Sequence, residues 1–497
     1  MRLDQALSDQ AARRPDAPAI RDTLGHDWTF AGLDHAVDAL AEQLAASGVA
    51  KDDRVLLLVE NCAPAIAAIY AASRLGAVAI PCNARLSEAE VDRVIDHATP
   101  AAVLMTSDIS TEAAAHAARM GAHSIEGIFG RLDLKPLPSD PDPAMADVGV
   151  LLYTTGTTGK PKGVMLTHDN LIFGGNASRV VRGLTEADVV YGVLPVSHVF
   201  GLSSIVVACT LAGAAIRLEP RYDPKRLYEA LQDGITALSA VPQMLAKLMH
   251  YTETQGHTRL PASQLRYVSS GAAPLDLDWK RRTEAFFGLP LQNGYGMTEA
   301  TAGVCVTQHD KTSDDISVGP ALPGVELRID TDAPGGEGPV GEILVRGGNV
   351  MKGYFRNPEA TDAAFTEGGW LRTGDLGELD TEGNLNIRGR SKELIIHGGF
   401  NVYPPEVEAA LNDHPKVIQS AVIGHLEGGD EKVWAYVEVS PDDHPSEEEL
   451  RAFVGQTLVG YKRPSRIVLT ERLPAAPTGK ILKHLLHSQT IPLAKGG

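Results

Sequence analysis

Two kinds of hydrophobic pattern alternate along the first half of the chain. Leucine and valine recur at helical spacing from Leu33 to Leu44, and Gly48 is placed to end that helix. Short continuous apolar runs, typical of buried strands, lie on either side of an alanine-rich helical stretch over residues 63–75. The predicted strands are residues 54–59, 77–80, 101–105, 148–153, 189–194 and 235–241. Strands that alternate with helices predict α/β layers with largely parallel sheets.

The pattern changes in the second half of the chain. Alternating apolar and polar positions over 325–346 predict short, more antiparallel strands. The segment 389–393 is a candidate domain boundary, because about 100 residues follow it, enough for a small α+β domain. The predicted fold is α/β, with a large N-terminal multi-layer α/β domain and a small C-terminal α+β domain. The predicted boundaries are 1–389 for the first domain, 390–393 for the connection and 394–497 for the second.

A loop rich in hydrogen-bond donors follows the predicted strand 148–153. Residues 154–163 read Thr-Thr-Gly-Thr-Thr-Gly-Lys-Pro-Lys-Gly. Glycines let the backbone approach a ligand closely, and the hydroxyl, amide and ammonium donors suit a polyphosphate. The loop is not a Walker A loop, because two residues separate Gly156 from Gly159 and Pro161 follows Lys160. An ordinary exposed turn is the alternative interpretation of such a loop.

Composition narrows the function classes. The formal charge is −18, from 45 basic and 63 acidic side chains, which disfavours general nucleic-acid or anionic-membrane binding. The four cysteines lie far apart without metal spacing, so we expect reduced, mostly buried thiols and a cytoplasmic location. No apolar signal region opens the sequence and no run reaches the length of a membrane span. The GxGxxG match at 336–341 leads into a predicted strand, which argues against a dinucleotide site.

Further segments follow the Thr/Gly loop in a recognisable order. They read Asn-Gly-Tyr-Gly-Met-Thr-Glu (293–299), Trp-Leu-Arg-Thr-Gly-Asp (370–375), Gly-Arg-Ser-Lys-Glu (389–393) and Pro-Thr-Gly-Lys (477–480). Together with the loop they resemble the adenylate-forming superfamily, which comprises acyl-CoA synthetases, adenylation domains of peptide synthetases and luciferases. The resemblance extends from about Val55 to Lys480. It is closest to the aryl- and medium-chain acyl-CoA ligases.

The resemblance implies an ATP site built from several separated segments. The implied ATP-binding residues are Thr154, Thr155, Gly156, Thr157, Thr158, Lys160, Gly271, Ala272, Ala273, Asn293, Gly294, Tyr295, Gly296, Thr298, Asp375, Arg390 and Lys480. Tyr295 would stack on adenine, with an open face between two glycines, and Asn293 would lie near the adenine amino group. Asp375, expected at a strand end, would accept the ribose hydroxyls.

The implied catalytic residues are His198, Thr298, Glu299 and Lys480. Glu299 would hold Mg²⁺ between phosphates, and Lys480 would bridge the substrate carboxylate and the α-phosphate. His198 would border the acid's carboxylate and the tunnel for CoA. Each type also has a plain structural explanation: Asp375 as a turn residue or helix cap, His198 as a hydrogen-bonded core residue, and Lys480 as a solvated charge.

Coenzyme A and the acid would occupy neighbouring regions. The implied CoA-binding residues are Arg85, His198, Gly398 and Gly399. The implied acyl pocket contains Val199, Gly201, Val241, Gly271, Ala302 and Gly303, within segments that carry no charged residue. An uncharged aromatic or medium-chain monocarboxylate is therefore expected, with small residues such as Gly201 and Gly303 leaving room for its body. Lys392 occupies the hinge position about which the small domain of such enzymes swings.

The predicted function is an AMP-forming, ATP-dependent carboxylic acid–CoA ligase that uses ATP, Mg²⁺ and coenzyme A. The expected partners are small molecules, with no nucleic acid and no integral membrane association, and the chain acts alone or as a homodimer. Two alternatives stay open. One is an enzyme that loads the adenylate onto a carrier protein, and the other is a non-catalytic acyl-adenylate or nucleotide-binding protein. Glu299, Asp375 and Lys480, all present, argue against the second alternative.

Overall fold

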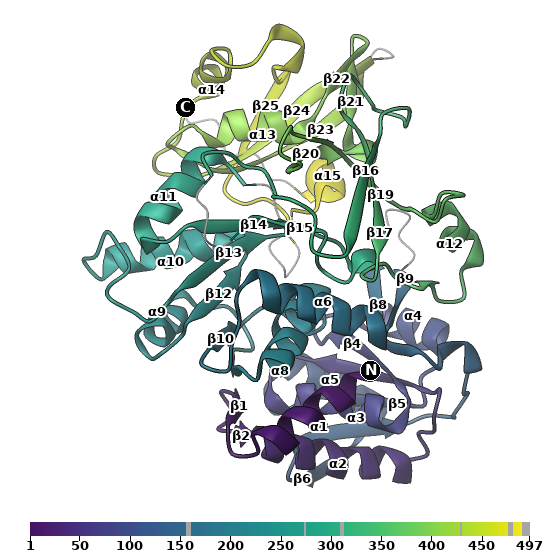
Figure 1. Cartoon of the computed structure of the whole chain (residues 1–497). Coiled ribbons are helices and arrows are strands. Elements are labelled where there is room, and N and C mark those ends of the chain that lie inside the picture. The colour runs from purple at the N-terminus through teal and green to yellow at the C-terminus, as the bar shows by residue number, and fades with distance from the viewer. Residues whose placement is uncertain (156–160, 273–274, 309–312, 428–429, 476–480, 490–497) are drawn as a thin grey trace.

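The computed structural model describes residues 1–155, 161–272, 275–308, 313–427, 430–475 and 481–489 (Figure 1). Within these residues, two eight-stranded sheets form the larger part of the molecule. The first sheet has the order β15 (Cys305–Val306), β14 (Leu291–Tyr295), β13 (Tyr267–Gly271), β12 (Ala237–Ala240), β10 (Val189–Gly192), β11 (Ala215–Leu218), β1 (Pro18–Arg21), β2 (Asp27–Thr29). The second has the order β18 (Gly353–Tyr354), β9 (Pro161–Thr167), β8 (Val148–Thr155), β4 (Val78–Asn83), β3 (Arg54–Val59), β5 (Ala102–Met105), β7 (Gly130–Pro136), β6 (His123–Gly127).

Helices cover both sheets and fill the space between them. Those of the larger part are α1 (Leu3–Arg13), α2 (Phe30–Ala46), α3 (Ala63–Leu75), α4 (Glu88–Ala98), α5 (Thr111–Met120), α6 (His168–Val181), α7 (Val199–Gly201), a π-helical stretch (Leu202–Val207), α8 (Ala208–Ala212), α9 (Pro224–Gln232), α10 (Pro242–Thr254), α11 (Leu277–Phe287) and α12 (Pro358–Ala364). The predicted helix over 63–75 and strand over 54–59 are confirmed with these bounds.

Alternation along the strands explains the layers. On β3, Leu57 packs into a core shared with α2, α3, α6 and the first sheet, whereas Leu56 and Leu58 pack against α4 and α5. The far face of the first sheet is covered by α9, α10 and α11. The result is five layers, α–β–α–β–α. Helix α3 is buried from Ala63 to Ser73 because its alanines allow close approach on all sides.

The prediction of largely parallel sheets is only half right. The first sheet is parallel from β14 to β1, but in the second only β8, β4, β3 and β5 run parallel. Strand β9 returns beside β8 after the short Thr/Gly loop, and a connection of that length permits only antiparallel pairing. Strand β10 ends at Gly192, short of the predicted 194, because the buried Asn61 amide donates to the carbonyls of Gly192 and Leu194.

Smaller sheets follow the two large ones. The predicted antiparallel segment is confirmed as part of a sheet with the order β16 (Val325–Asp330), β17 (Gly341–Gly347), β19 (Leu371–Leu379), β20 (Leu385–Arg390). The C-terminal part contains the hairpin β21 (Ile395–His397) and β22 (Phe400–Val402), and a sheet of β23 (Val417–Glu427), β24 (Asp430–Val439) and β25 (Arg466–Thr470). Its helices are α13 (Pro404–Asn412), α14 (Glu447–Val454) and α15 (Leu486–Gln489).

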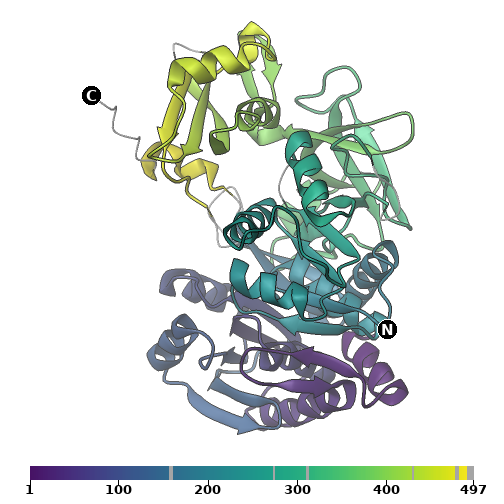
Figure 2. The same cartoon turned by 90° about the vertical axis from the view of Figure 1, so that its left-hand side faces the viewer.

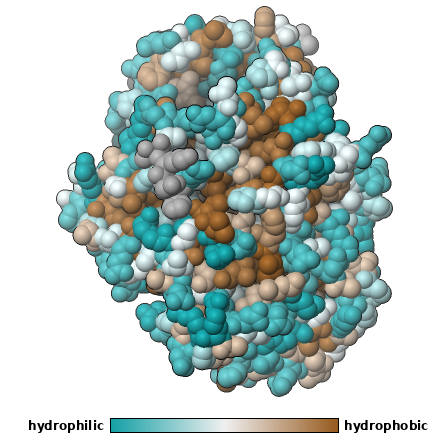
Figure 3. Space-filling view, in the orientation of Figure 1, coloured by the Kyte–Doolittle hydropathy of each residue, from teal (hydrophilic) through white to brown (hydrophobic). Residues whose placement is uncertain are grey.

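The C-terminal part is a separate small unit with its own core (Figure 2). It lies at the opposite end of the molecule from the N-terminal helices in both views. Tyr403 packs with Val340 and Leu376 of the larger part, and the Gln243 amide donates to Gln419 Oε1 at 2.6 Å. Apolar side chains gather in the middle of the face seen in Figure 3, whereas its lower part is mostly hydrophilic.

The structure bears on two expectations, one about the cysteines and one about membrane-spanning helices. All four cysteines are buried, as expected, and burial raises the pKa of Cys82 and Cys209 to about 12 and those of Cys62 and Cys305 further. Among the helices of the described ranges, none combines the length and apolar character needed to cross a bilayer.

Candidate functional site

Tyr295, Asp375 and Arg390 meet where the first large sheet faces the antiparallel sheet. Tyr295 ends β14, and its hydroxyl donates to Asp375 Oδ2 at 2.5 Å. Arg390 is the cross-strand partner of Asp375, and its Nε lies 3.2 Å from Oδ1. Burial and the Asp375 carboxylate raise the pKa of Tyr295 well above its usual value, so its phenol stays protonated and donates. These three predicted ATP-site residues therefore form one connected group.

The prediction that Asp375 lies at a strand end is wrong. Asp375 lies inside β19, directly after Gly374, whose φ is +72° and which lies within the irregular part of the pairing with β17, between Arg372 and Leu376. Backbone of this kind re-aims the next side chain. Asp375 is buried, at 7% exposed, and its carboxylate is oriented by the Tyr295 hydroxyl and Arg390 Nε.

Asn293 is held in a fixed orientation two residues before Tyr295. It is buried on β14, and its Nδ2 donates to the carbonyls of Ile316 and Ser317, each at 3.1 Å. Both amide hydrogens are thus used by the backbone, so Oδ1 points the other way as an acceptor. That polarity suits a ligand amino group such as that of adenine.

Glu299 has a partner that the sequence patterns did not indicate. The hydroxyl of Tyr354, on β18, donates to Glu299 Oε1 at 2.9 Å, and Lys162 Nζ lies 4.7 Å from the centre of the Tyr354 ring. Glu299 belongs to a 3₁₀ turn (Thr298–Ala300) together with Thr298, and both are half-buried. The hydrogen bond between Tyr354 and Glu299 links the predicted metal ligand to the Thr/Gly loop, because Tyr354 lies on β18 and β18 pairs with β9, the strand that follows this loop.

The donor set fits a magnesium ion carried by a nucleotide. Glu299 keeps acceptor positions beyond the one used by Tyr354. In the described part of the chain, no group of three or more His, Cys, Asp or Glu side chains could hold a metal. A single carboxylate, completed by phosphate oxygens and water, is a usual way for proteins to bind Mg²⁺.

Several predicted residues lie outside the described residues. These are Gly156, Thr157, Thr158, Lys160, Ala273 and Lys480. The structure shows the framework on both sides of the loop, where Thr154 and Thr155 end β8 opposite Lys162 and Pro161. Ala272 follows β13 with a φ of +65°, a strained conformation for alanine that marks a constrained segment beside Gly271.

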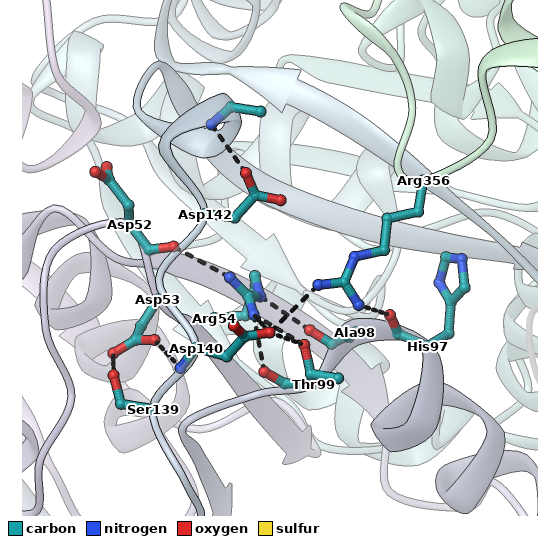
Figure 4. A network of polar contacts seen from close by, with 11 residues as sticks. Asp52, Asp53, Arg54, His97, Ala98, Thr99, Ser139, Asp140, Asp142 and Arg356 are labelled. Atoms are coloured by element: carbon teal, nitrogen blue, oxygen red, sulfur yellow. Dashed lines mark hydrogen bonds and ion pairs between the residues drawn. The ribbon is translucent and has the colours of Figure 1, made fainter.

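A polar network joins Arg54 and Arg356 to the C-terminal end of α4 (Figure 4). Two arginines, Arg54 and Arg356, bond the last carbonyls of α4: Arg54 Nε donates to Ala98 O at 2.9 Å and Arg356 Nη1 to His97 O at 3.1 Å. His97 in turn lies 2.7 Å from the hydroxyl of Tyr153, the residue before Thr154. Burial and Arg356 lower the pKa of His97, which favours a neutral imidazole hydrogen-bonded to the phenol. The network fixes the position from which the loop leaves β8.

His198 lies at the start of α7. Its Nδ1 accepts from the Phe200 backbone N–H at 3.2 Å, and the side chain is half-buried. Val199 and Val241 of the predicted acyl pocket are buried nearby in the same core, whose margin includes Phe200. A methyl group on Gly271 would lie 3.3 Å from the Phe200 ring, which brings two predicted pocket segments together.

The idea that the pocket glycines leave room for substrate is wrong at Gly201, where a Cβ would lie 2.2 Å from the Pro195 carbonyl oxygen. Gly201 is therefore required by protein packing and does not open the pocket. At Gly303 a Cβ would lie 2.6 Å from Leu322 Cδ1, the end of a side chain that can shift. Gly294 is less restricted, since its nearest neighbour, Cys305 O, would be 3.4 Å away.

Gly296 shows the same effect most strongly. A Cβ there would lie 1.3 Å from the carbonyl oxygen of Ala302, a residue held at a φ of +78°. We expect Gly296→Ala to destabilise the protein by about 1–3 kcal/mol or more, because the backbone must shift to admit the methyl group. Urea denaturation measures the change, with Gly460→Ala as the control, since a Cβ at Gly460 meets no atom within 4 Å. Equal midpoints for the two variants would contradict this account.

The predicted CoA and hinge residues are not gathered into one site. Arg85 Nε lies 3.3 Å from Glu60 Oε1, so part of its charge is already neutralised. Gly398 and Gly399 form the exposed turn between β21 and β22 with φ of +58° and +82°, and within the described chain no atom would approach a Cβ there within 4 Å. They line no tunnel in this domain arrangement. Lys392 is exposed in a 3₁₀ turn (Ser391–Glu393) between the two parts.

The C-terminal segment is tied to this connection. Lys483 Nζ lies 2.9 Å from Glu393 Oε2 and 2.8 Å from Glu408 Oε1. Burial opposes the charge, yet the two carboxylates raise the pKa of Lys483 above its usual value. The chain three residues beyond Lys480 is thereby fixed to α13.

Comparisons with known proteins agree with this geometry. A family model described as AMP-binding enzyme matches residues 7–355, and one described as AMP-binding enzyme C-terminal domain matches residues 406–480. The chain is 33% identical to 2-succinylbenzoate–CoA ligase of Bacillus cytotoxicus, over 97% of both chains. It is 34% identical to feruloyl-CoA synthase of Amycolatopsis sp., over 97% of this chain and 98% of the relative.

A solved structure gives the same result in three dimensions. The O-succinylbenzoate coenzyme A synthetase from Bacillus subtilis, in complex with ATP and magnesium ion, superposes with a TM-score of 0.83 at 31% identity. The match covers 97% of this chain and 99% of that one. With a family model that matches more than half of its length and relatives matched almost end to end, the chain belongs to the AMP-binding enzyme family.

Proposed function

We propose that the protein is an ATP-dependent carboxylic acid–CoA ligase that acts on an aromatic acid through an acyl-adenylate. The proposal is carried by the connected group of Tyr295, Asp375 and Arg390, together with Glu299 in the turn that follows Tyr295. This group offers acceptors for ribose, a cation near phosphate and a carboxylate for a metal. The aromatic class is inferred from relatives whose names specify 2-succinylbenzoate, ferulate and 4-coumarate.

In the first step, the acid's carboxylate attacks the α-phosphorus of ATP, and pyrophosphate leaves. Asn293 and Tyr295 would hold adenine, while Asp375 would accept ribose hydroxyls, so that the α-phosphate is fixed in position. Glu299 would hold Mg²⁺, which supplies positive charge against the phosphates when bound. Thr298 would donate to the α-phosphate, and Lys480 would bring a cation to the developing charge.

In the second step, the thiol of CoA attacks the acyl carbon, and AMP leaves. His198 stands beside Pro195 and Val199 at the edge of the proposed acyl pocket, where it would border both the adenylate and the incoming thiol. The glycine turn at 398–399 is exposed here, so a rotation of the domain about 390–393 would be needed to bring it to the site. We therefore propose two domain arrangements, one for each step, and assign the boundaries 1–389 and 394–497 on that basis.

A substrate panel tests the aromatic assignment. We expect kcat/KM, followed by AMP release, to be higher for benzoate or cinnamate than for acetate or malonate, because apolar burial contributes about 0.8 kcal/mol per CH₂. Hexanoate tests the medium-chain class directly. Acetate or malonate as the clear best substrate would contradict the proposed pocket.

Two measurements separate the alternatives. ATP–pyrophosphate exchange that depends on the acid distinguishes a catalyst from a non-catalytic binding protein. CoA-dependent AMP release distinguishes a CoA ligase from an enzyme that loads a carrier protein. We place the enzyme in the cytoplasm, where its thiols stay reduced, and light scattering on the same sample would decide between a monomer and a homodimer.

A further inference from the structure

Arg182, directly after helix α6, is a buried cation with few partners. It is 6% exposed, and its Nη1 donates to the Ser204 carbonyl at 2.5 Å. Its guanidinium carbon lies 6.0 Å from the centre of the Phe200 ring and 5.8 Å from that of Tyr267. No carboxylate in the described ranges forms an ion pair with it, although a buried charge ordinarily needs one.

Another buried arginine shows what full compensation looks like. Arg54 is entirely buried, and its guanidinium donates to Asp52 O, Ala98 O, Thr99 O and Thr99 Oγ1, with Asp140 at 3.5 Å. A guanidinium has five N–H donors, and Arg54 uses most of them. Arg182 has one such bond recorded in the described part of the chain. The Ser204 carbonyl and two aromatic faces stabilise its charge only in part.

The location of Arg182 connects it to the acyl pocket. Ser204 and Phe200, two of its three contacts, lie in the stretch 199–204 that contains the predicted pocket residues Val199 and Gly201, and Phe200 lies against Gly271, another predicted pocket residue. Ser203, in the same segment, has a buried hydroxyl with no partner in the described residues, but it faces Gly174 of α6, where a Cβ would lie 2.7 Å from it. The buried donor beside the Phe200 ring is therefore Arg182.

We propose that Arg182 determines substrate specificity by binding an oxygen acceptor at the far end of the aromatic acid, remote from the carboxylate that reacts. Its free N–H groups suit a second carboxylate, in bidentate fashion, or a single phenolic oxygen. The assignment rests on the proposed function. It also revises the expectation that the acid has no second charge. That expectation was based on pocket segments without charged residues and did not include Arg182 at the end of α6.

The first test needs no variant. Two series of different length, benzoates and cinnamates, carry hydrogen, methyl, hydroxyl or carboxylate at the para position, and acid-dependent pyrophosphate exchange gives kcat/KM for each. In the series whose length fits, we expect hydroxyl or carboxylate to exceed methyl by at least tenfold. Comparing the para-hydroxyl with the para-carboxylate substrates identifies which oxygen is preferred, and either preference supports the assignment. A preference for methyl in both series would overturn it.

The second test removes the cation. Arg182→Met should lower the ratio of para-oxygen to para-methyl substrates at least tenfold while the KM for ATP stays unchanged. Arg179→Met is the matched control, since Arg179 lies on the same helix and bonds only to Asn176 among the described residues. Arg182→Lys keeps the charge and should retain part of the preference, which also covers the case in which the methionine variant fails to fold. An unchanged ratio in a folded variant would reject Arg182 as the specificity residue.

Different results would reject the assignment of Arg182 and the proposed function. Pyrophosphate exchange with the aromatic acids at equal ratios would reject the assignment of Arg182 and leave the proposed function standing. Absence of exchange with every acid would reject both.

Discussion

Lys480→Ala is expected to slow ATP–pyrophosphate exchange by about 10²–10³-fold, roughly 3–4 kcal/mol, and to spare thioester formation from preformed acyl-AMP. Only the first step creates charge between the acid's carboxylate and the α-phosphate, where this cation would act. Lys480 lies outside the described residues, so its role rests on the sequence motif 477–480 and on the family. Separate assays of the two half-reactions measure the effect.

Lys483→Ala is the matched control for this prediction. It removes a lysine from the same segment, but one that pairs with Glu393 and Glu408 of the connection and α13. We expect this change to loosen the C-terminal part and to lower both half-reactions together. Equal losses in both half-reactions of Lys480→Ala would show that its lysine is structural as well, and the two-arrangement scheme would fail.

Asp375→Asn is expected to weaken ATP binding by about 10- to 100-fold, because hydrogen bonds to a charged group contribute about 1.5–3 kcal/mol. The change removes the negative charge and replaces one of the two oxygens that Tyr295 and Arg390 contact by an amide donor, while the volume stays the same. Calorimetric titration with ATP measures the loss directly, without relying on turnover.

Asp380→Asn provides the comparison for Asp375. Asp380 lies in the exposed turn between β19 and β20, where it accepts from the backbone N–H of Glu382 and Asn384. It shares the sheet with Asp375 but not the site, so ATP affinity should remain unchanged. If both variants bind ATP as the wild type does, Asp375 is a structural residue and the ribose assignment is wrong.

Periodicity was sufficient for the elements whose packing is simple. Strand β3 and helix α3 were predicted with their observed bounds because β3 is buried along its whole length between Asp53 and Glu60, and α3 is buried from Ala63 to Ser73 and ends at Gly76. Periodicity did not predict the features that depend on contacts with distant parts of the chain. Nothing local in residues 161–167 indicates that they return beside β8, and the termination of β10 depends on Asn61, more than a hundred residues earlier.

The same distinction holds for the site. The motifs that resemble the adenylate-forming superfamily predicted Tyr295 and Asp375 as site residues, and the structure brings both together with Arg390. Tyr354 and Arg182 were missed because an isolated tyrosine or arginine carries no local signal, and their partners lie 55 and 22 positions away. For Tyr354, the neighbouring Gly353 is a weak sequence signal, and the structure shows that this Gly-Tyr pair lies beside β9.

The burial of the cysteines has a chemical consequence for an enzyme of this kind. An acyl-adenylate is an activated acid that any accessible thiolate would attack, including one of the protein's own. Cys305 is paired across the sheet with Tyr295, next to the proposed adenine site, yet its thiol is enclosed and its pKa is raised by burial, as are those of the other three. None of the protein's four thiols is therefore placed to attack such an acyl-adenylate, which would react with a thiol delivered from outside.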